Sequence, residues 1–254
     1  MTKRTTIITG ATSGIGESTA RLLSNDGHRL ILCGRRKNRL EKIRDELSTF
    51  TEVEILNFDV RDRKEVDSAI DSLSQEWQTI DVLINNAGNA HGLDPIHEGS
   101  IEDWEAMIDI NVKGLLYMTR KISPGMVDRR VGHIINIGSI AGKEVYPKGN
   151  VYCGSKYAVD AINDGMRLDL VPYGIKVSLV NPGLVDTEFS SVRFKGDQQK
   201  ADATYTGMTP LYANDIAEVI QFILNRPPHV NISDVIAFPA AQASTAVIHR
   251  GGKA

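Results

Sequence analysis

The sequence predicts a doubly wound α/β domain built around a parallel β-sheet. Short apolar runs rich in β-branched residues alternate with longer amphipathic runs along the whole chain, the order of strands and helices in such a domain. Several short runs are apolar at consecutive positions, as expected for strands buried on both faces. No repeat or Pro/Ser-rich linker divides the 254 residues, so we expect a single domain over residues 1–254.

The individual elements follow from these runs. The expected strands cover residues 5–9, 29–33, 53–58, 82–85, 133–137, 177–180 and 235–238. The expected helices cover residues 16–26, 38–47, 64–75, 101–129, 152–171 and 214–224. The segment 184–211 breaks the alternation, because it is polar and too long for an ordinary connection. We expect it to be a substrate loop or lid.

Composition excludes several classes of function. The net charge is −3 and basic residues are spread along the chain, so we expect no nucleic acid and no membrane as partner. No apolar run approaches the roughly eighteen residues of a membrane span, and the N-terminus has no signal-peptide pattern. Cys33 and Cys153 are far apart and lack metal-ligand spacing, which favours a reducing compartment. We therefore expect a cytoplasmic protein without a metal.

A glycine-rich turn follows the first expected strand. Residues 9–16 read TGATSGIG and lead directly into a helix. Glycines at such a turn let the backbone approach a pyrophosphate, whose charge then lies at the helix N-terminus. The spacing Gly-x-x-x-Gly-x-Gly departs from the usual Gly-x-Gly-x-x-Gly fingerprint. The alternative is a glycine-rich turn without a ligand, but three glycines at this position favour dinucleotide binding.

The end of the second strand indicates which dinucleotide. Arg35 and Arg36 lie about twenty residues after Gly16, where an acidic residue would hold a ribose 2′-hydroxyl and arginine a 2′-phosphate. Two guanidinium groups can bind that phosphate through paired hydrogen bonds. A solvated basic turn is the alternative, and we favour NADP over NAD.

Two further strand ends carry polar or small residues. Asp59 follows the third strand and can accept a hydrogen bond from an adenine amino group. The sequence NNAG at 85–88 closes the fourth strand, and its small Ala87-Gly88 pair would let the adenosine ribose pass close to the backbone. Both lie at carboxyl ends of strands, where ligands of such sheets bind.

The spacing Tyr-x-x-x-Lys occurs twice, as Tyr117/Lys121 and as Tyr152/Lys156. Each spacing places its pair on one helix face. Only Tyr152 has a serine at a strand end thirteen residues earlier, Ser139. We therefore interpret Tyr117 as a packing residue and Tyr152 as the general acid and base of a hydride-transfer reaction.

The chemistry explains these residue types. Reduction of a ketone by hydride requires a proton for the developing alkoxide, and the phenol of Tyr152 can supply it. The free phenol has a pKa of about 10, and the ammonium of Lys156 together with an oxidised nicotinamide would lower the Tyr152 pKa. Lys156 would also bond the nicotinamide ribose, and Ser139 would donate a hydrogen bond to the substrate oxygen.

Together these motifs resemble the short-chain dehydrogenase/reductase family from end to end: residues 9–16, NNAG at 85–88, Ser139, Tyr152-x-x-x-Lys156 and NPG at 181–183. The resemblance implies a Rossmann-type, doubly wound parallel sheet of about seven strands flanked by helices. It also implies a catalytic tetrad of Asn111, Ser139, Tyr152 and Lys156, in which Asn111 would hold a water that passes protons from Lys156 to solvent. The segment 182–187 would meet the nicotinamide.

The residues expected to bind NADP are Gly10, Thr12, Ser13, Gly14, Ile15, Gly16, Arg35, Arg36, Asp59, Val60, Asn86, Ala87, Gly88, Tyr152, Lys156, Pro182, Gly183, Val185 and Thr187.

A narrower likeness concerns the substrate. Residues 133–139, 187–197 and 248–250 resemble the NADP-dependent 3-hydroxy acid dehydrogenases, which act on L-serine, L-allo-threonine or related 3-hydroxy acids, or on the matching semialdehydes, and form tetramers. This implies a homotetramer and a substrate carboxylate. Ser139, Tyr152 and Arg193 are the expected substrate contacts, and Arg193 would bind the carboxylate. For Arg193, an ordinary surface arginine is an equal alternative.

Two other functions stay open at this point. One is a short-chain reductase for another carbonyl compound, such as a 3-oxoacyl thioester, a sugar or a steroid. The other is a non-catalytic NADP-binding regulator on the same fold, because fold does not fix function. The complete set of Asn111, Ser139, Tyr152 and Lys156 argues against the regulator, which needs no acid.

Overall fold

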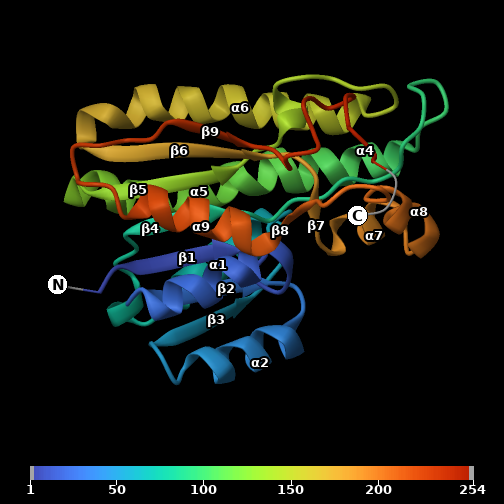
Figure 1. Ribbon diagram of the computed structural model, residues 1–254. Helices are drawn as coiled ribbons and strands as arrows, with labels where there is room; N and C mark the ends of the chain where they lie inside the picture. Colours follow the sequence, from blue (N-terminus) through green and yellow to red (C-terminus); the bar gives the residue numbers. More distant parts are fainter. Residues whose placement is uncertain (1–2, 252–254) are drawn as a thin grey trace.

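The computed structural model describes residues 3–251, which form a seven-stranded sheet with helices on both faces (Figure 1). Every strand pair in the sheet is parallel, in the order β3-β2-β1-β4-β5-β6-β9. The fold class that the sequence predicts is thereby confirmed. The strands are β1 (Thr5–Thr9), β2 (Arg29–Gly34), β3 (Val53–Asn57), β4 (Val82–Asn85), β5 (Gly132–Ile137), β6 (Ile175–Pro182) and β9 (Asp234–Ala237).

Helices cover both faces of the sheet. They are α1 (Gly14–Asn25), α2 (Lys37–Leu47), α3 (Arg63–Asp71), α4 (Ile101–Ile108), α5 (Leu115–Arg129), α6 (Asn150–Leu170), α7 (Glu188–Arg193), α8 (Gln198–Ala203) and α9 (Ala213–Leu224). One buried apolar cluster contains side chains from α3, α5 and α6, such as Met118 and Val159. A second cluster contains side chains from α1, α2 and α9, such as Leu23 and Ile220. The central strands contribute to both clusters, which explains why they are apolar at consecutive positions.

Two expected helices differ from the structure. The run expected as one helix over 101–129 is divided by a π-helical turn, Asp109–Gly114, between α4 and α5. The helix expected over 64–75 ends at Asp71 and is followed by a short 3₁₀ turn, Gln75–Trp77. Such turns are set by local backbone hydrogen bonds, which apolar periodicity alone does not reveal.

The segment 184–211 has regular structure of its own. It contains α7, α8 and the short strand β7 (Val185–Asp186), which pairs in parallel with β8 (Leu211–Tyr212). The segment lies at the carboxyl end of the sheet (Figure 1). None of the helices within residues 3–251 is long and apolar enough to cross a lipid bilayer.

Candidate active site

The glycine turn after β1 has the backbone that glycine requires. Gly10 and Gly14 have φ values of +66° and +54°, a left-handed region that side chains disfavour. A Cβ on Gly10 would lie 2.9 Å from Nδ2 of Asn86. A Cβ on Gly16 would overlap the carbonyl oxygen of Gly10. The turn therefore tolerates no side chain at these positions, and Gly16 acts by packing.

Hydrogen bonds connect this turn to the end of β4. Asn86 Nδ2 donates to Thr9 O at 2.9 Å, and the backbone N–H groups of Asn86 and Ala87 both donate to Thr9 Oγ1 at 3.0 Å. Ser13 precedes α1, but its side chain makes no capping hydrogen bond to the helix. The free N–H groups of the first helical turn are thus available for an anion.

A long cavity of about 320 Å³ runs along the carboxyl end of the sheet from this turn. It is lined by every residue expected to bind the cofactor except Gly16, and by Ser139. Further lining residues are Gly34, Phe58, Asn89, Ile110, Ile137, Gly138, Glu188, Phe189 and Val192. The structure therefore brings the glycine turn, the arginines and the Ser139/Tyr152/Lys156 group to one cavity.

Arg36 is held at one end of this cavity. Its Nη2 donates to Thr12 Oγ1 at 2.8 Å and to Ser13 Oγ at 2.7 Å. Its Nη1 lies 2.7 Å from Oε2 of Glu188, and Arg39 binds the other carboxylate oxygen at 2.6 Å. Partial burial opposes it, but hydrogen bonds from both arginines lower the pKa of Glu188 to about 2. The first residue of α7 is thereby ionically bound to the beginning of α2.

Arg35 and Asp59 face each other across the same end. Nη1 of Arg35 lies 3.6 Å from Oδ2 of Asp59, and the Arg35 side chain is 56% exposed. Arg61 binds the Asp59 carboxylate through both oxygens. Although partial burial raises the pKa of Asp59, the hydrogen bonds from Arg61 outweigh it, and the net shift is downward. Asp59 is therefore a charged acceptor at neutral pH.

Ser139, Tyr152 and Lys156 meet at the other end. Ser139 precedes a 3₁₀ turn, Ile140–Gly142, and its hydroxyl accepts from Ala141 N at 3.1 Å. Tyr152 and Lys156 lie one turn apart on α6 and are 8% and 7% exposed. Lys156 Nζ donates to the carbonyl oxygen of Ile137 at 2.9 Å. The strand end of β5 thus holds both the serine and the lysine.

The pKa of Tyr152 is raised in the chain without a cofactor. Burial raises it, and a hydrogen bond from Ser139 only partly opposes that rise. Burial also lowers the pKa of Lys156 to about 8. In the chain without a cofactor, the cost of burying a phenolate dominates, and the expected lowering by Lys156 together with an oxidised nicotinamide stays a prediction. The neutral phenol is the form that donates a proton.

Asn111 lies in the π-helical turn and is 2% exposed. Its Oδ1 accepts from Asn89 N at 2.9 Å, and its Nδ2 donates to Asn89 O and to Ser155 Oγ. A Cβ on Gly88 would lie 3.0 Å from Asn111 Oδ1 and 3.6 Å from Lys156 Nζ. Asn111 and Lys156 are therefore neighbours over Gly88, although Asn111 does not line the long cavity.

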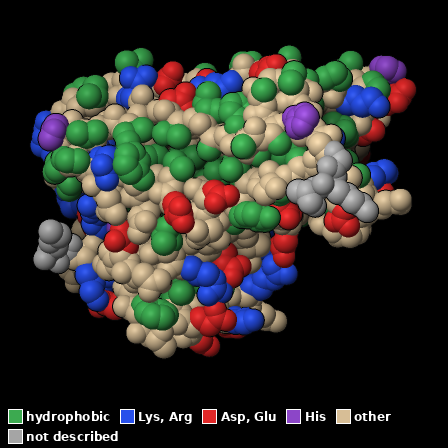
Figure 2. Space-filling model, in the orientation of Figure 1, with side chains coloured by type: hydrophobic (Ala, Val, Ile, Leu, Met, Phe, Trp, Pro, Cys, Tyr) green, Lys and Arg blue, Asp and Glu red, His purple; other side chains and the backbone are tan. Residues whose placement is uncertain are grey.

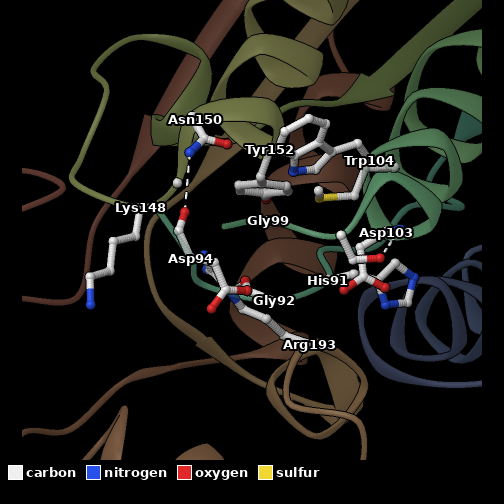
Figure 3. A pocket seen from close by; sticks show the side chains of 13 residues that line it. His91, Gly92, Asp94, Gly99, Asp103, Trp104, Lys148, Asn150, Tyr152 and Arg193 are labelled. Atoms are coloured by element: carbon white, nitrogen blue, oxygen red, sulfur yellow. Dashed lines mark hydrogen bonds between the residues drawn. The ribbon is translucent and has the colours of Figure 1, made fainter. Parts of the chain in front are cut away.

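A second, small cavity opens beside Tyr152 (Figure 3). Arg193 lines it, with Nε donating to Gly92 O at 3.1 Å. The Arg193 guanidinium carbon lies 5.5 Å from the ring centroid of Tyr146 and 5.7 Å from that of Tyr152. His91 lines the same cavity, and partial burial lowers its pKa. Figure 3 shows Arg193 and His91 on the side of the cavity opposite Asn150.

The segment 184–211 makes several polar contacts with the rest of the molecule. Besides the Glu188 ion pairs, Lys195 Nζ lies 2.9 Å from Oδ2 of Asp103 on α4. The backbone N–H of Gly92 donates to the Arg193 carbonyl at 3.0 Å. Near the C-terminus, Arg250 Nη2 donates to Thr204 O at 3.0 Å. Glu188 and Arg193, the first and last residues of α7, therefore make separate contacts.

Sequence reasoning missed several residues of the site. Glu188, Arg39, Tyr146 and Trp104 carry no motif, and each reaches the site only through tertiary packing. The sequence contains one signal that could have identified Glu188, because this acidic residue directly follows the segment 182–187 expected to meet the nicotinamide. Within residues 3–251, no three His, Cys, Asp or Glu side chains gather in a way that could hold a metal ion.

Comparison with known proteins gives consistent matches. Residues 4–198 match the family model described as short chain dehydrogenase. The chain is 48% identical over 246 residues to the NADP-dependent 3-hydroxy acid dehydrogenase of Salmonella typhi, covering 96% of this chain and 98% of that protein. It is 44% identical over 250 residues to the NADP-dependent 3-hydroxy acid dehydrogenase of Schizosaccharomyces pombe, covering 97% and 96%.

Two solved structures are also similar. The closed form of serine dehydrogenase complexed with NADP⁺ superimposes with a TM-score of 0.92 at 45% identity, covering 97% of this chain and 99% of that chain. Serine dehydrogenase from Escherichia coli superimposes with a TM-score of 0.82 at 39% identity, covering 94% and 99%.

Proposed function

This chain belongs to the short-chain dehydrogenase family, and on that premise we propose that it is an NADP-dependent oxidoreductase for small 3-hydroxy acids. The observation that carries the proposal is the long cavity that joins Arg36 and the glycine turn to Ser139, Tyr152 and Lys156. A cavity with phosphate-binding groups at one end and a proton donor at the other suits hydride transfer to a carbonyl group.

The residues present fit NADP. The cradle at Gly10 and Gly14, where added side chains would clash or be strained, suits the close approach of a pyrophosphate. Arg36, Ser13 and Thr12 would hold the 2′-phosphate, and Asp59 the adenine amino group. Val185, Thr187, Pro182 and Gly183 would adjoin the nicotinamide end. When bound, NADP supplies or accepts the hydride.

The side chains of this chain then transfer the proton and bind the substrate oxygen. Tyr152, buried and neutral, donates its proton to the oxygen in reduction and takes it back in oxidation. Ser139 donates a hydrogen bond to the same oxygen as negative charge develops there. Lys156 would bond the ribose of bound NADP and hold a proton near Tyr152, and Asn111 would hold a water that links Lys156 to solvent. The position of Asn111 beside Lys156 over Gly88 supports that role.

Arg193 supports the choice of substrate class. Its guanidinium lies against the ring of Tyr152 in a small cavity and leaves N–H groups free beyond the bond to Gly92. A 3-hydroxy acid with its hydroxyl at Tyr152 would present its carboxylate to such a group. The segment 184–211 would act as the lid that brings Arg193 there. Of the two serine dehydrogenase structures, the closed NADP⁺ complex has the higher TM-score.

A substrate panel tests the proposal. NADP reduction is measured at 340 nm with L-serine, L-allo-threonine and simple 3-hydroxy acids, and in reverse with 3-oxoacyl thioesters, sugars and steroid ketones. We expect turnover of the hydroxy acids with a preference for NADP over NAD. Turnover of only thioesters or steroid ketones would show that the proposed substrate class is wrong. Tight NADP binding without any turnover would favour the non-catalytic regulator.

Two variants test the binding residues. Arg36→Ala should raise the Kd of NADP by about 10²-fold while leaving that of NAD within about threefold, since an arginine–phosphate pair is lost.

Arg193→Lys retains the charge but loses paired hydrogen bonds, and should raise the KM of the hydroxy acid about tenfold. An unchanged KM would show that Arg193 does not bind the substrate carboxylate and is an ordinary surface arginine.

The assembly and location are part of the same proposal. Ile236 and Phe238 on and after the edge strand β9, and Phe222 on α9, are 47%, 38% and 52% exposed. Figure 2 shows apolar side chains gathered over this edge. Such a patch favours self-association, and we propose a homotetramer, to be checked by light scattering. Cys33 and Cys153, both free and buried, suit a cytoplasmic enzyme.

A further inference from the structure

The backbone of Ser139 is held by Asn181, the first residue of the NPG sequence at 181–183. After β5 ends at Ile137, the N–H of Gly138 still bonds to the Val180 carbonyl, but the N–H of Ser139 has no backbone acceptor. Asn181 Oδ1 accepts from Ser139 N instead, at 2.9 Å. Asn181 is 1% exposed, so this bond is shielded from competing water.

The contact requires the glycine before the serine. A Cβ on Gly138 would overlap Asn181 Oδ1. The missing side chain of Gly138 is therefore the space that the amide of Asn181 occupies. Any larger residue there would push the amide away from Ser139.

The other end of the amide is fixed as well. Asn181 Nδ2 donates to Asp234 Oδ1 at 2.6 Å, and Asp234 Oδ2 accepts from Lys143 Nζ at 2.7 Å. Lys143 also binds Asp160 on α6 at 2.5 Å. Because a carboxylate only accepts and an N–H only donates, the amide satisfies both neighbours in one orientation alone. A chain of polar contacts thus runs from Asp160, through Lys143, Asp234 and Asn181, to the backbone of Ser139.

We propose that Asn181, oriented by Asp234, is a positioning residue that sets the direction of the Ser139 hydroxyl toward the reacting oxygen. This rests on the proposed function, in which Ser139 donates to that oxygen. Asn181 fixes the Ser139 N–H on one side of the strand end, while Lys156 fixes the Ile137 carbonyl two residues earlier. The serine and lysine are thereby held in one frame, and small displacements at such sites cost up to about 10²-fold in rate.

Exchange of the amide and the carboxylate tests the proposal. In Asn181→Asp, two carboxyl groups face each other without a donor, so the amide's contact with Asp234 is lost. We expect kcat to fall about 10- to 100-fold with the Kd of NADPH unchanged. In the double variant Asn181→Asp/Asp234→Asn, the new amide donates to the new carboxylate, which still accepts from Ser139. We expect the double variant to recover kcat to within about threefold of wild type.

A pH profile separates positioning from general loss of structure. Two facing carboxyl groups share a proton because one pKa of the pair is raised. That proton replaces the lost donor, so kcat of Asn181→Asp should increase as the pH falls, relative to wild type. The double variant should not show this dependence. Asn231→Asp is the matched control, since Asn231 lies on the same sheet edge and donates to Val177 O rather than toward Ser139.

Hydrogen exchange gives a readout that needs no substrate. The amide of Ser139 should exchange slowly in wild type and in the double variant, and faster in Asp234→Ala, which should still fold because the Asp234 side chain is 40% exposed. Equal exchange in all of them, or no recovery in a folded double variant, would overturn the role of Asn181 and Asp234. Full activity of Ser139→Ala would instead overturn the proposed function of Ser139, whatever the exchange rates.

Discussion

The two Tyr-x-x-x-Lys pairs have the same helical spacing but opposite surroundings. On α5, Lys121 Nζ binds both carboxylate oxygens of Asp71, at 2.7 and 2.8 Å, and Tyr117 packs against an apolar cluster. On α6, Lys156 has no carboxylate partner within residues 3–251 and donates to a backbone carbonyl at the end of β5. The difference shows that the same spacing can place a pair on the solvent-exposed side of a helix or at the carboxyl end of the sheet, where the proposed chemistry lies.

The largest effect is expected for the α6 tyrosine. Tyr152→Phe removes the proton donor and should lower kcat about 10²- to 10⁴-fold, whereas NADPH affinity should remain within about threefold. Steady-state kinetics and fluorescence titration measure the two quantities. Tyr117→Phe is the matched control and should keep kcat within about twofold. If Tyr152→Phe kept more than a tenth of the wild-type kcat, Tyr152 would not be the proton donor, and the contrast between the two pairs would be contradicted.

The lysines should differ in how they respond to pH. The pKa of Lys156 is lowered to about 8 by burial, so its charged form is present below that pH and is lost as the pH rises through it. Binding of ribose hydroxyl groups favours the ammonium, and the Kd of NADPH should therefore rise above about pH 8, by at most about tenfold per unit. Calorimetry in two buffers should show proton uptake at pH 8.5.

Two lysine variants show which group causes the rise in the Kd of NADPH above about pH 8. Lys156→Met should abolish both the pH transition and the proton uptake, and Lys121→Met should retain them. A transition that survives in Lys156→Met would mean that another group titrates.

The smallest effect is expected at the α5 lysine. Lys121→Met breaks an ion pair in which the Asp71 side chain is 68% exposed, and such pairs contribute less than about 1 kcal/mol. The free energy of unfolding, measured by urea denaturation, should fall by no more than that, with kcat unchanged. A larger loss of stability would show that Lys121 has a structural role beyond its solvent-exposed pair.

The strands and most of the nucleotide-binding surface could be predicted from the sequence, for a physical reason. Strands of a parallel sheet that are buried on both faces are apolar at consecutive positions, and a backbone that approaches a phosphate closely needs glycine. Both requirements are therefore visible in the residue types of the sequence. The turn at Gly10 and Gly14 is of this kind. The position of Arg36 beside the glycine turn was predictable because a charge that suits a phosphate is a local property of the sequence.

The π-helical turn and the lid contacts could not be predicted, because tertiary packing determines them. The turn ends at Gly114, where a Cβ would lie 2.8 Å from Val60 Cγ2, a residue from a distant part of the chain. Glu188 meets Arg36 and Arg39 across about 150 residues of sequence. Only the family resemblance drew attention to Asn111, since a helical asparagine carries no signal of its own.

The separate contacts at the two ends of α7 have a consequence for the order of events in turnover. Glu188, the first residue of α7, binds Arg36 beside the cofactor cavity, while Arg193, its last residue, and Lys195 bind Gly92 and Asp103. We expect the contacts of Arg193 and Lys195 to open for exchange of substrate and product while Glu188 stays bound to Arg36. We therefore expect compulsory-order kinetics, with the nucleotide binding first and leaving last, which product-inhibition patterns will reveal.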